Sequence, residues 1–154
     1  MSRMLSEFDK LSRVYSDVGG VDNVPRELLH LLPRNKCDCD RMEEIEAIGM
    51  PGVQPILLHL LMWLQDKNWP VSYPMTQFLQ TVGEPLVDPV RFVLHSDDSI
   101  WKHWVLLDIV EHWEHKLRLR ILADLRQIAE SPTPDDESEN LPEIAKEIIA
   151  KTES

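Results

Sequence analysis

The sequence predicts an all-α fold built from stacked helix pairs. Apolar residues recur at helical spacing in most segments, and no stretch of useful length alternates between apolar and polar residues as a strand would. One pattern also occurs twice, in residues 53–71 and 87–104: Val-x-Pro, an apolar run, and an acidic residue three places before a tryptophan. The matched positions are offset by 34 residues at the start and 32 at the end. A repeat of this size that carries two helical segments is typical of stacked helix pairs.

Length and composition indicate one globular domain spanning residues 1–154. The chain is 43% hydrophobic and 28% charged, which is typical of a folded protein. Residues 1–24 are expected to form an N-terminal helix and loop, and residues 25–151 the helical stack. No apolar run approaches the roughly 20 residues of a membrane helix, and the N-terminus lacks the apolar segment of a secretion signal. We therefore expect a cytoplasmic protein without membrane association.

The net charge bears on the kind of partner. The chain carries 27 acidic and 16 basic residues, a formal net charge of −11. Phosphates would be repelled, so nucleic acid is not an expected partner. A basic protein is compatible with this charge. An acidic surface that only keeps the protein soluble explains the same composition.

The first part of the chain predicts three short helices. Residues 6–17 carry apolar side chains at helical spacing, and a glycine-containing loop follows. A second helix is expected over residues 25–32. The third covers residues 40–48, with Asp40 and Glu43 placed as in a capping box.

The first copy of the repeat predicts a buried helix followed by a turn and a second helix. Residues 53–64 leave little polar face, so this helix should be buried on most sides. Asn68 is placed to cap the next helix, with Pro70 in its first turn. Pro74 lies deeper, so it should bend that helix or delay its start to about Ser72.

The second copy predicts the centre of the domain. Pro85 and Pro89 mark a helix start, and Asp97 and Asp98 turn the chain and cap the helix that follows. That helix, residues 99–114, is apolar nearly all round, so we expect it to lie between neighbouring helices.

The C-terminal part predicts two further helices. Residues 116–130 carry an apolar face and the most basic segment of the chain. A Pro-containing break and an acidic loop or helix start follow, before a last helix over residues 142–151. The terminal helices are expected either to cap the stack or to leave an end free for a dimer, so the oligomeric state stays open.

The turn after the first repeat helix is similar to a known one. Asp66, Trp69, Pro70 and Val71 resemble the Asp-x-x-Val-Arg turn of HEAT-type repeats, in which the aspartate braces the turn between paired helices. The strings WLQDKNWP (residues 63–70) and WKHW (residues 101–104) are unusual.

Residues 31–38, 62–71, 97–106 and 131–139 resemble a family of small bacterial domains of unknown function with HEAT-like helices. The resemblance covers roughly residues 28–150 and leaves out the N-terminal twenty or so. It implies an α-α superhelix of stacked HEAT-like antiparallel helix pairs. It implies no reaction.

Four residues are candidates for a partner surface. Trp69 and Trp113 lie at element ends, where one face of an indole is often packed and an edge is wet. Lys102 and His103 are the polar groups beside Trp101. Core packing is the favoured alternative for the two tryptophans, and a solvated helix face also explains Lys102 and His103. Structural roles in the repeat turns are expected for Asp66, Asn68, Pro70, Asp97, Asp98 and Trp101.

A metal site is the main chemical alternative. Asp108, His112 and His115 would lie on one helical face at i, i+4 and i+7, and such side chains suit zinc. A solvated polar strip explains them without metal. Cys37 and Cys39 lack further ligands at a recognisable spacing, so both are expected to be free thiols. No nucleophile or phosphate-loop signature occurs, so no cofactor is expected.

These observations favour a non-enzymatic protein–protein interaction module. A narrower hypothesis is an immunity-type protein that neutralises a basic partner, in which opposite charges would speed association. The alternative is a metal-dependent enzyme that uses the face of Asp108, His112 and His115.

Overall fold

The computed structural model describes residues 6–154, and this range is all-α, without strands. The α-helices are α1 (Glu7–Val14), α2 (Met42–Ile48), α3 (Leu57–Leu61), α4 (Ser72–Leu79), α5 (Val87–Leu94), α6 (Ser99–Asp108), α7 (His115–Arg120), α8 (Leu122–Glu130), α9 (Pro134–Ser138) and α10 (Leu141–Glu153). Six 3₁₀ turns in this range are η1 (Ser16–Val18), η2 (Arg26–Leu31), η3 (Gln54–Ile56), η4 (Met62–Leu64), η5 (Glu84–Leu86) and η6 (Val110–His112). The all-α prediction is confirmed for the described residues.

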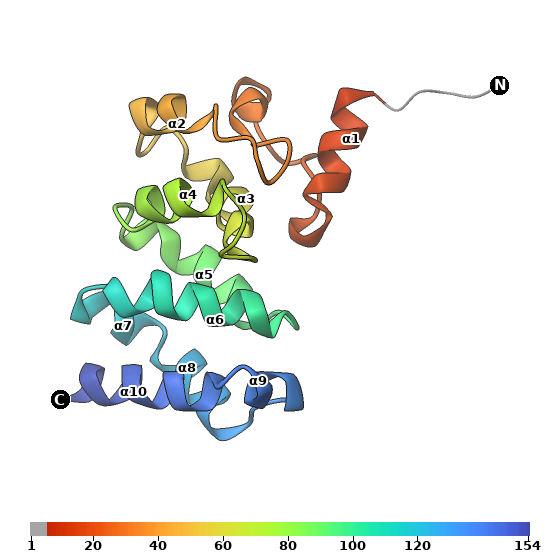
Figure 1. Cartoon of the computed structure of the whole chain (residues 1–154). Helices are drawn as coiled ribbons and strands as arrows, with labels where there is room; N and C mark the ends of the chain where they lie inside the picture. Colours follow the sequence, from red (N-terminus) through yellow and green to blue (C-terminus); the bar gives the residue numbers. More distant parts are fainter. Residues whose placement is uncertain (1–5) are drawn as a thin grey trace.

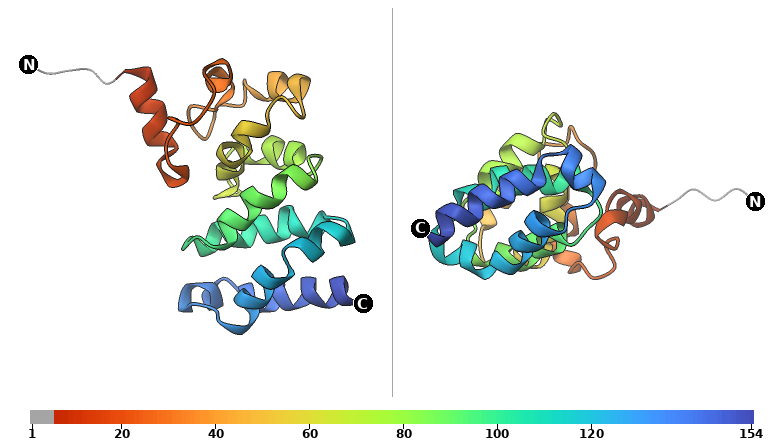
Figure 2. Two further views of the ribbon diagram at one scale, coloured as in Figure 1. Left: turned by 180° about the vertical axis from the view of Figure 1, so that it is seen from behind. Right: turned by 90° about the horizontal axis from the view of Figure 1, so that it is seen from below.

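The helices lie in layers, one above another (Figure 1). α3 lies with α4, α5 lies with α6, and the last layer holds α8, α9 and α10, with α7 between this layer and the end of α6. Seen from behind and from below, α4, α6 and α10 form one row and α3, α5 and α8 form the other (Figure 2). In residues 6–154, no helix is long and apolar enough to cross a membrane.

One hydrophobic core runs through these layers, from Leu11 in α1 to Ile148 in α10. Trp63 and Trp101 are buried within it, as the sequence predicts. The indole of Trp101 donates from Nε1 to the carbonyl of Leu61 at 3.0 Å, which ties α6 to α3. Consecutive layers are therefore joined by hydrogen bonds as well as by apolar packing.

The two repeat copies use their matched residues differently. Both first helices open with a 3₁₀ turn that has proline in second place, and these prolines are Pro55 and Pro85, not Pro55 and Pro89. Asp98 caps α6, because its side chain accepts a hydrogen bond from Trp101 N at 3.0 Å. Asp66 instead closes a turn, because its Oδ1 accepts from Asn68 N at 2.8 Å.

Two predicted helix caps are wrong. α4 begins at Ser72, as expected from Pro74, but Asn68 does not cap it and Pro70 lies before its first turn. α2 has no side-chain cap, and the expected capping box of Asp40 and Glu43 does not form. Asp38 is bound elsewhere, because its Oδ2 accepts from Arg34 N at 2.9 Å.

Three predicted helices also differ in form. Residues 26–31 are a 3₁₀ turn, where the sequence predicts an α-helix. The expected helix over residues 99–114 ends at Asp108, and Trp113 is in extended conformation at φ −70° and ψ 149°. The expected helix over residues 116–130 is divided into α7 and α8 at Ile121, whose φ of −116° departs from helical geometry.

The N-terminal segment, which we define as residues 6–24, stands beside the layers (Figure 1). Ser6 caps α1 by accepting a hydrogen bond from Asp9 N at 3.0 Å. Tyr15 is fully buried against α3 and η4, and its ring meets that of Trp63 edge to face at 5.8 Å. The N-terminal segment is therefore held to the layers through the end of α1.

Candidate functional site: an acidic edge

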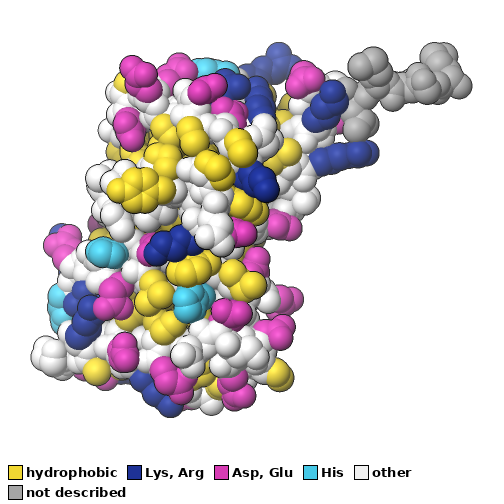
Figure 3. Space-filling model, in the orientation of Figure 1, with side chains coloured by type: hydrophobic (Ala, Val, Ile, Leu, Met, Phe, Trp, Pro, Cys, Tyr) yellow, Lys and Arg dark blue, Asp and Glu magenta, His cyan; other side chains and the backbone are white. Residues whose placement is uncertain are grey.

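Loops from successive layers meet at one edge of the molecule. The turn between α5 and α6 lies there, together with the loop after α3, η1 and the region of α9 (Figure 1). Five carboxylate side chains line hollows at this position, and we call them the acidic edge: Asp17, Asp97, Asp98, Asp135 and Glu139. Acidic side chains gather along the same edge on the molecular surface (Figure 3).

Three hollows adjoin at this edge. The largest, of about 510 Å³, lies between the α5–α6 turn and α8. The second, of about 440 Å³, lies between the start of α6 and α9, and the third, of about 230 Å³, lies between that turn and η1. Asp97 lines all three. The α5–α6 turn is therefore the centre of the concave surface at this edge.

The acidic edge carries uncompensated negative charge. Among residues 6–154, no lysine, arginine or histidine nitrogen lies within 4.0 Å of its five carboxylates. Asp17 accepts a hydrogen bond from the Gln65 amide at 3.0 Å, and Asp98 caps α6. Neither contact removes a full charge. Ile100, which is 49% exposed, adds an apolar surface to the second hollow.

A buried ion pair supports this edge from inside. Lys102 in α6 and Asp136 in α9 are both buried, and Lys102 Nζ lies 3.0 Å from Asp136 Oδ1. The Ser99 hydroxyl donates to the same oxygen at 2.6 Å. Burial raises the pKa of Asp136, but the hydrogen bonds from Ser99 and Lys102 outweigh it, so the pKa is lowered overall. Asp136 therefore stays ionised and fixes α9 against α6.

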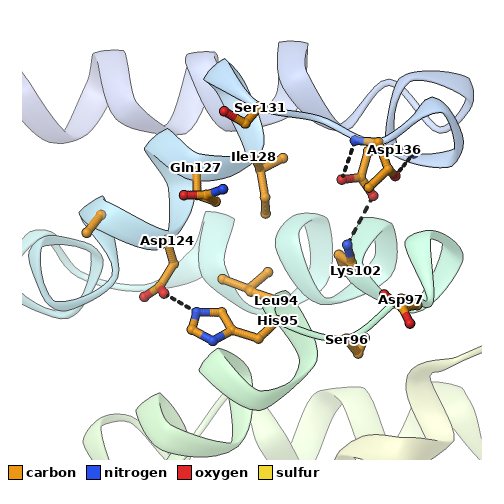
Figure 4. A pocket seen from close by; sticks show the side chains of 12 residues that line it. Leu94, His95, Ser96, Asp97, Lys102, Asp124, Gln127, Ile128, Ser131 and Asp136 are labelled. Carbon is orange, nitrogen blue, oxygen red and sulfur yellow. Dashed lines mark hydrogen bonds and ion pairs between the residues drawn. The ribbon is translucent and has the colours of Figure 1, made fainter.

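A second network lies across the largest hollow (Figure 4). Asp124 of α8 is 7% exposed, and it accepts hydrogen bonds from Arg91 of α5 and from His95, the residue that follows α5. Arg91 Nε lies 3.0 Å from its Oδ2, and His95 Nε2 lies 2.5 Å from its Oδ1. Because Arg91 and His95 are bound to one carboxylate, this network joins the layer of α5 and α6 to the last one.

The four predicted partner residues are not brought together on one surface. Lys102 and Trp113 are each 5% exposed, so the expectation that they are accessible is wrong for both. Lys102 is held by Asp136, and Trp113 belongs to the core. Trp69 is half-buried against the Trp63 ring, with 5.6 Å between centroids.

His103 is the predicted residue that borders the acidic edge. It is half-buried, and its Nδ1 donates to the backbone carbonyl of Glu139 at 2.9 Å. Its ring also meets Trp104 edge to face at 4.7 Å. Lys67 lies over the Trp104 ring at 5.0 Å, in cation–π geometry. His103 therefore joins α6 to the residue that follows α9.

The proposed metal ligands do not share a helical face. Asp108 is the last residue of α6, His112 belongs to η6, and His115 begins α7. The predicted face fails because the helix ends at Asp108, whose carboxylate lies 3.8 Å from Lys67 Nζ. Within residues 6–154, no three His, Cys, Asp or Glu side chains are grouped as a metal site would require. Cys37 and Cys39 are free thiols, as expected.

The sequence interpretation missed the acidic residues from α9 and the network at Asp124. The spacing of Arg91 and His95 was a usable signal, because residues four apart share one face of a helix. Nothing local indicates Asp124, which follows His95 by 29 positions. Asp135 and Glu139 were visible only as an acidic segment.

Comparison with known families gives one result. The family described as Domain of unknown function (DUF5071) matches residues 31–149, which contain α2 to α9 and most of α10. No curated protein matches the chain. The match includes the Lys102–Asp136 pair and four of the five acidic-edge residues, and it leaves out Asp17. Since it covers well over half of the 154 residues, the chain belongs to the DUF5071 family.

Proposed function

We propose that the protein is a non-enzymatic interaction module that binds a basic protein partner at its acidic edge. The observation that carries this proposal is the meeting of three hollows at Asp97, on an edge whose five carboxylates have no cationic partner in residues 6–154. Like charges held close together repel one another, and a cationic partner would relieve that repulsion.

The shape of the edge supports the same kind of partner. The second hollow is lined by four carboxylate side chains and by exposed Ile100. Lysine and arginine side chains present an apolar stem and a charged end, so they complement such a surface. A formal net charge of −11 adds long-range attraction, which would raise the rate of association with a basic protein.

The arrangement of the helices supports a scaffold role. We propose that the layers are HEAT-like antiparallel helix pairs wound into an α-α superhelix, and that family members are bacterial cytoplasmic proteins. The support is the alternation of two helix rows through successive layers and the proline-containing 3₁₀ turn that opens both α3 and α5 (Figure 2). Stacks of this kind present extended binding surfaces.

A narrower form of the proposal is an immunity-type role, in which the partner is a basic toxin. The small size and the acidic charge of the chain support it. Expression of the partner alone should then arrest growth, and co-expression of this protein should restore it. A partner that is harmless when expressed alone would rule out the immunity role and leave the interaction module standing.

Affinity capture from the native host tests the proposal. The edge variant carries Asp97→Asn, Asp135→Asn and Glu139→Gln. The control variant carries three substitutions at exposed acidic positions away from this edge: Glu43→Gln, Glu130→Gln and Glu147→Gln. Both variants change the formal net charge from −11 to −8.

The wild type and the control variant should retain the same protein, with an isoelectric point above about 9, and the edge variant should lose it. Retention by all three proteins would show that the acidic edge is not the binding surface. Loss from both variants would show that net charge alone governs binding, which also contradicts the proposal.

A further inference from the structure

The N-terminal segment is attached to the layers through a small polar cluster. The Tyr15 hydroxyl donates to the carbonyl of Pro33 at 2.8 Å and accepts from Trp63 Nε1 at 2.9 Å. His59 of α3 packs against the Tyr15 ring, with 5.5 Å between centroids. The Nε2 atom of His59 lies 2.9 Å from the carbonyl oxygen of Gly20. The cluster therefore fixes both the end of α1 and the loop that follows.

The contacts of His59 select its neutral form. A carbonyl oxygen only accepts, so Nε2 carries the hydrogen and donates to Gly20. Nδ1 is buried and has no hydrogen-bond partner. Protonation would therefore place on Nδ1 a buried donor without an acceptor, together with a positive charge removed from water. Burial lowers the pKa of His59, and the hydrogen bond to Gly20 opposes this only in part.

No charged side chain of the described residues compensates a protonated His59. The titratable group that faces it is Tyr15, and burial raises the pKa of that hydroxyl, which keeps it neutral. Asp17 of η1 is bound to the Gln65 amide. Other charged groups act on the Tyr15 side of the cluster, and they are Arg34, Asp38 and Arg41. His59 makes no ion pair with any of them.

We propose that His59 is a pH-sensitive switch for docking of the N-terminal segment. The neutral ring holds Tyr15 and Gly20 in place, and the protonated ring releases them. Release would expose Trp63, a core residue whose ring packs against Tyr15 of the N-terminal segment. It would also withdraw Asp17, which forms one wall of the third hollow.

The direction of the pH dependence follows from linkage. The pKa of His59 is lower when the segment is docked than the ordinary 6.5 expected when it is released. The released form therefore binds more protons, so docking is strongest above about pH 6.5 and weakens as the pH falls. Between the two pKa values of His59, the released fraction should rise about tenfold for each unit by which the pH falls.

Hydrogen exchange measured by mass spectrometry tests this on the full-length protein. For the peptide covering residues 15–24, the equilibrium constant for opening should rise about tenfold for each pH unit lowered from 6.5 to the pKa of the docked form. This constant is obtained after correction for intrinsic exchange rates. A peptide from α10 should show no such rise. In the variant His59→Gln, whose amide can still donate to Gly20, opening of residues 15–24 should be independent of pH.

The control is His30→Gln, which replaces an exposed histidine paired with Glu44 and should retain the wild-type pH response. Opening that is independent of pH in the wild type would overturn the proposal. An equal pH response in the wild type and in His59→Gln would overturn it as well. The Tyr15→Phe variant separates docking from titration, because it should open more at every pH while keeping the same slope.

Discussion

Lys102 Nζ lies 3.0 Å from Asp136 Oδ1, and this buried ion pair joins α6 to α9. Substitution Lys102→Met would leave the Asp136 carboxylate buried without its cation. We expect a loss of about 3 kcal/mol in the free energy of unfolding, measured by urea denaturation. Lys10→Met at the exposed pair with Glu7 should change it by less than about 0.5 kcal/mol. Equal effects of both substitutions would show that the Lys102 pair is not structural.

Acid should weaken the same region. Hydrogen bonds from Ser99 and Lys102 lower the pKa of Asp136 below its ordinary 3.8 despite burial. The unfolded chain therefore binds the proton more readily, and the stability due to Asp136 is present above about pH 3.8 and is lost below it. Urea denaturation between pH 2.5 and 5.5 should give a shallower pH dependence for Asp136→Asn than for the wild type. Asp88→Asn, at an exposed position, should keep the wild-type slope, and a parallel slope for Asp136→Asn would contradict this account.

The hydroxyl of Tyr15 should contribute to stability through two buried partners. Tyr15→Phe leaves the Pro33 carbonyl and the Trp63 indole N–H without their hydrogen bonds. The free energy of unfolding should fall by about 1–3 kcal/mol. Tyr73→Phe provides the matched control, because Tyr73 is 69% exposed and its hydroxyl takes part only in an exposed hydrogen bond from the Gln77 amide. Thermal or urea denaturation measures the free energy of unfolding of both variants. Equal losses in Tyr15→Phe and Tyr73→Phe would contradict this role of the Tyr15 hydroxyl.

Asp97 and Asp98 are neighbours with different roles. Asp98→Ala removes the side chain that accepts from Trp101 N at the start of α6, so a loss of about 1 kcal/mol is expected. Asp97→Ala should leave stability nearly unchanged, because Asp97 is exposed and makes no ion pair in residues 6–154. Urea denaturation of both variants measures these changes in the free energy of unfolding. Equal losses would show that Asp98 does not act as a helix cap distinct from the surface residue Asp97.

Helix positions were largely predictable because they depend on local sequence. Pro74 placed the start of α4 at Ser72, and Asp98 was identified as the cap of α6. The ends of helices depend on tertiary contacts and were less predictable. Trp113 is extended, and its carbonyl accepts a hydrogen bond from Arg118, which no periodicity of apolar residues indicates. The helix expected to continue past Asp108 ends there, where Ile109 departs from helical geometry at φ −114° and ψ −64°.

The candidate site was predicted only in part, because it combines residues distant in the sequence. Lys102 was a candidate surface residue because it is a polar group beside Trp101. Its partner Asp136 lies 34 positions later, and only packing of α9 onto α6 brings the two together. Asp97 was expected to serve a turn, but Asp135 and Glu139 make it part of an acidic surface. Asp66 and Asp98 occupy matched positions in the sequence repeat but have different roles. Asp66 closes a turn, and Asp98 caps α6.

The most direct test of the proposed function is the dissociation constant of the captured partner, measured by calorimetry at low and at moderate salt. The wild type and the control variant (Glu43→Gln, Glu130→Gln, Glu147→Gln) should bind with similar affinity that weakens as salt is raised. The edge variant (Asp97→Asn, Asp135→Asn, Glu139→Gln) should bind at least about tenfold more weakly at low salt, with a smaller salt dependence. Equal affinities and equal salt dependences for the edge and control variants would contradict binding at the acidic edge.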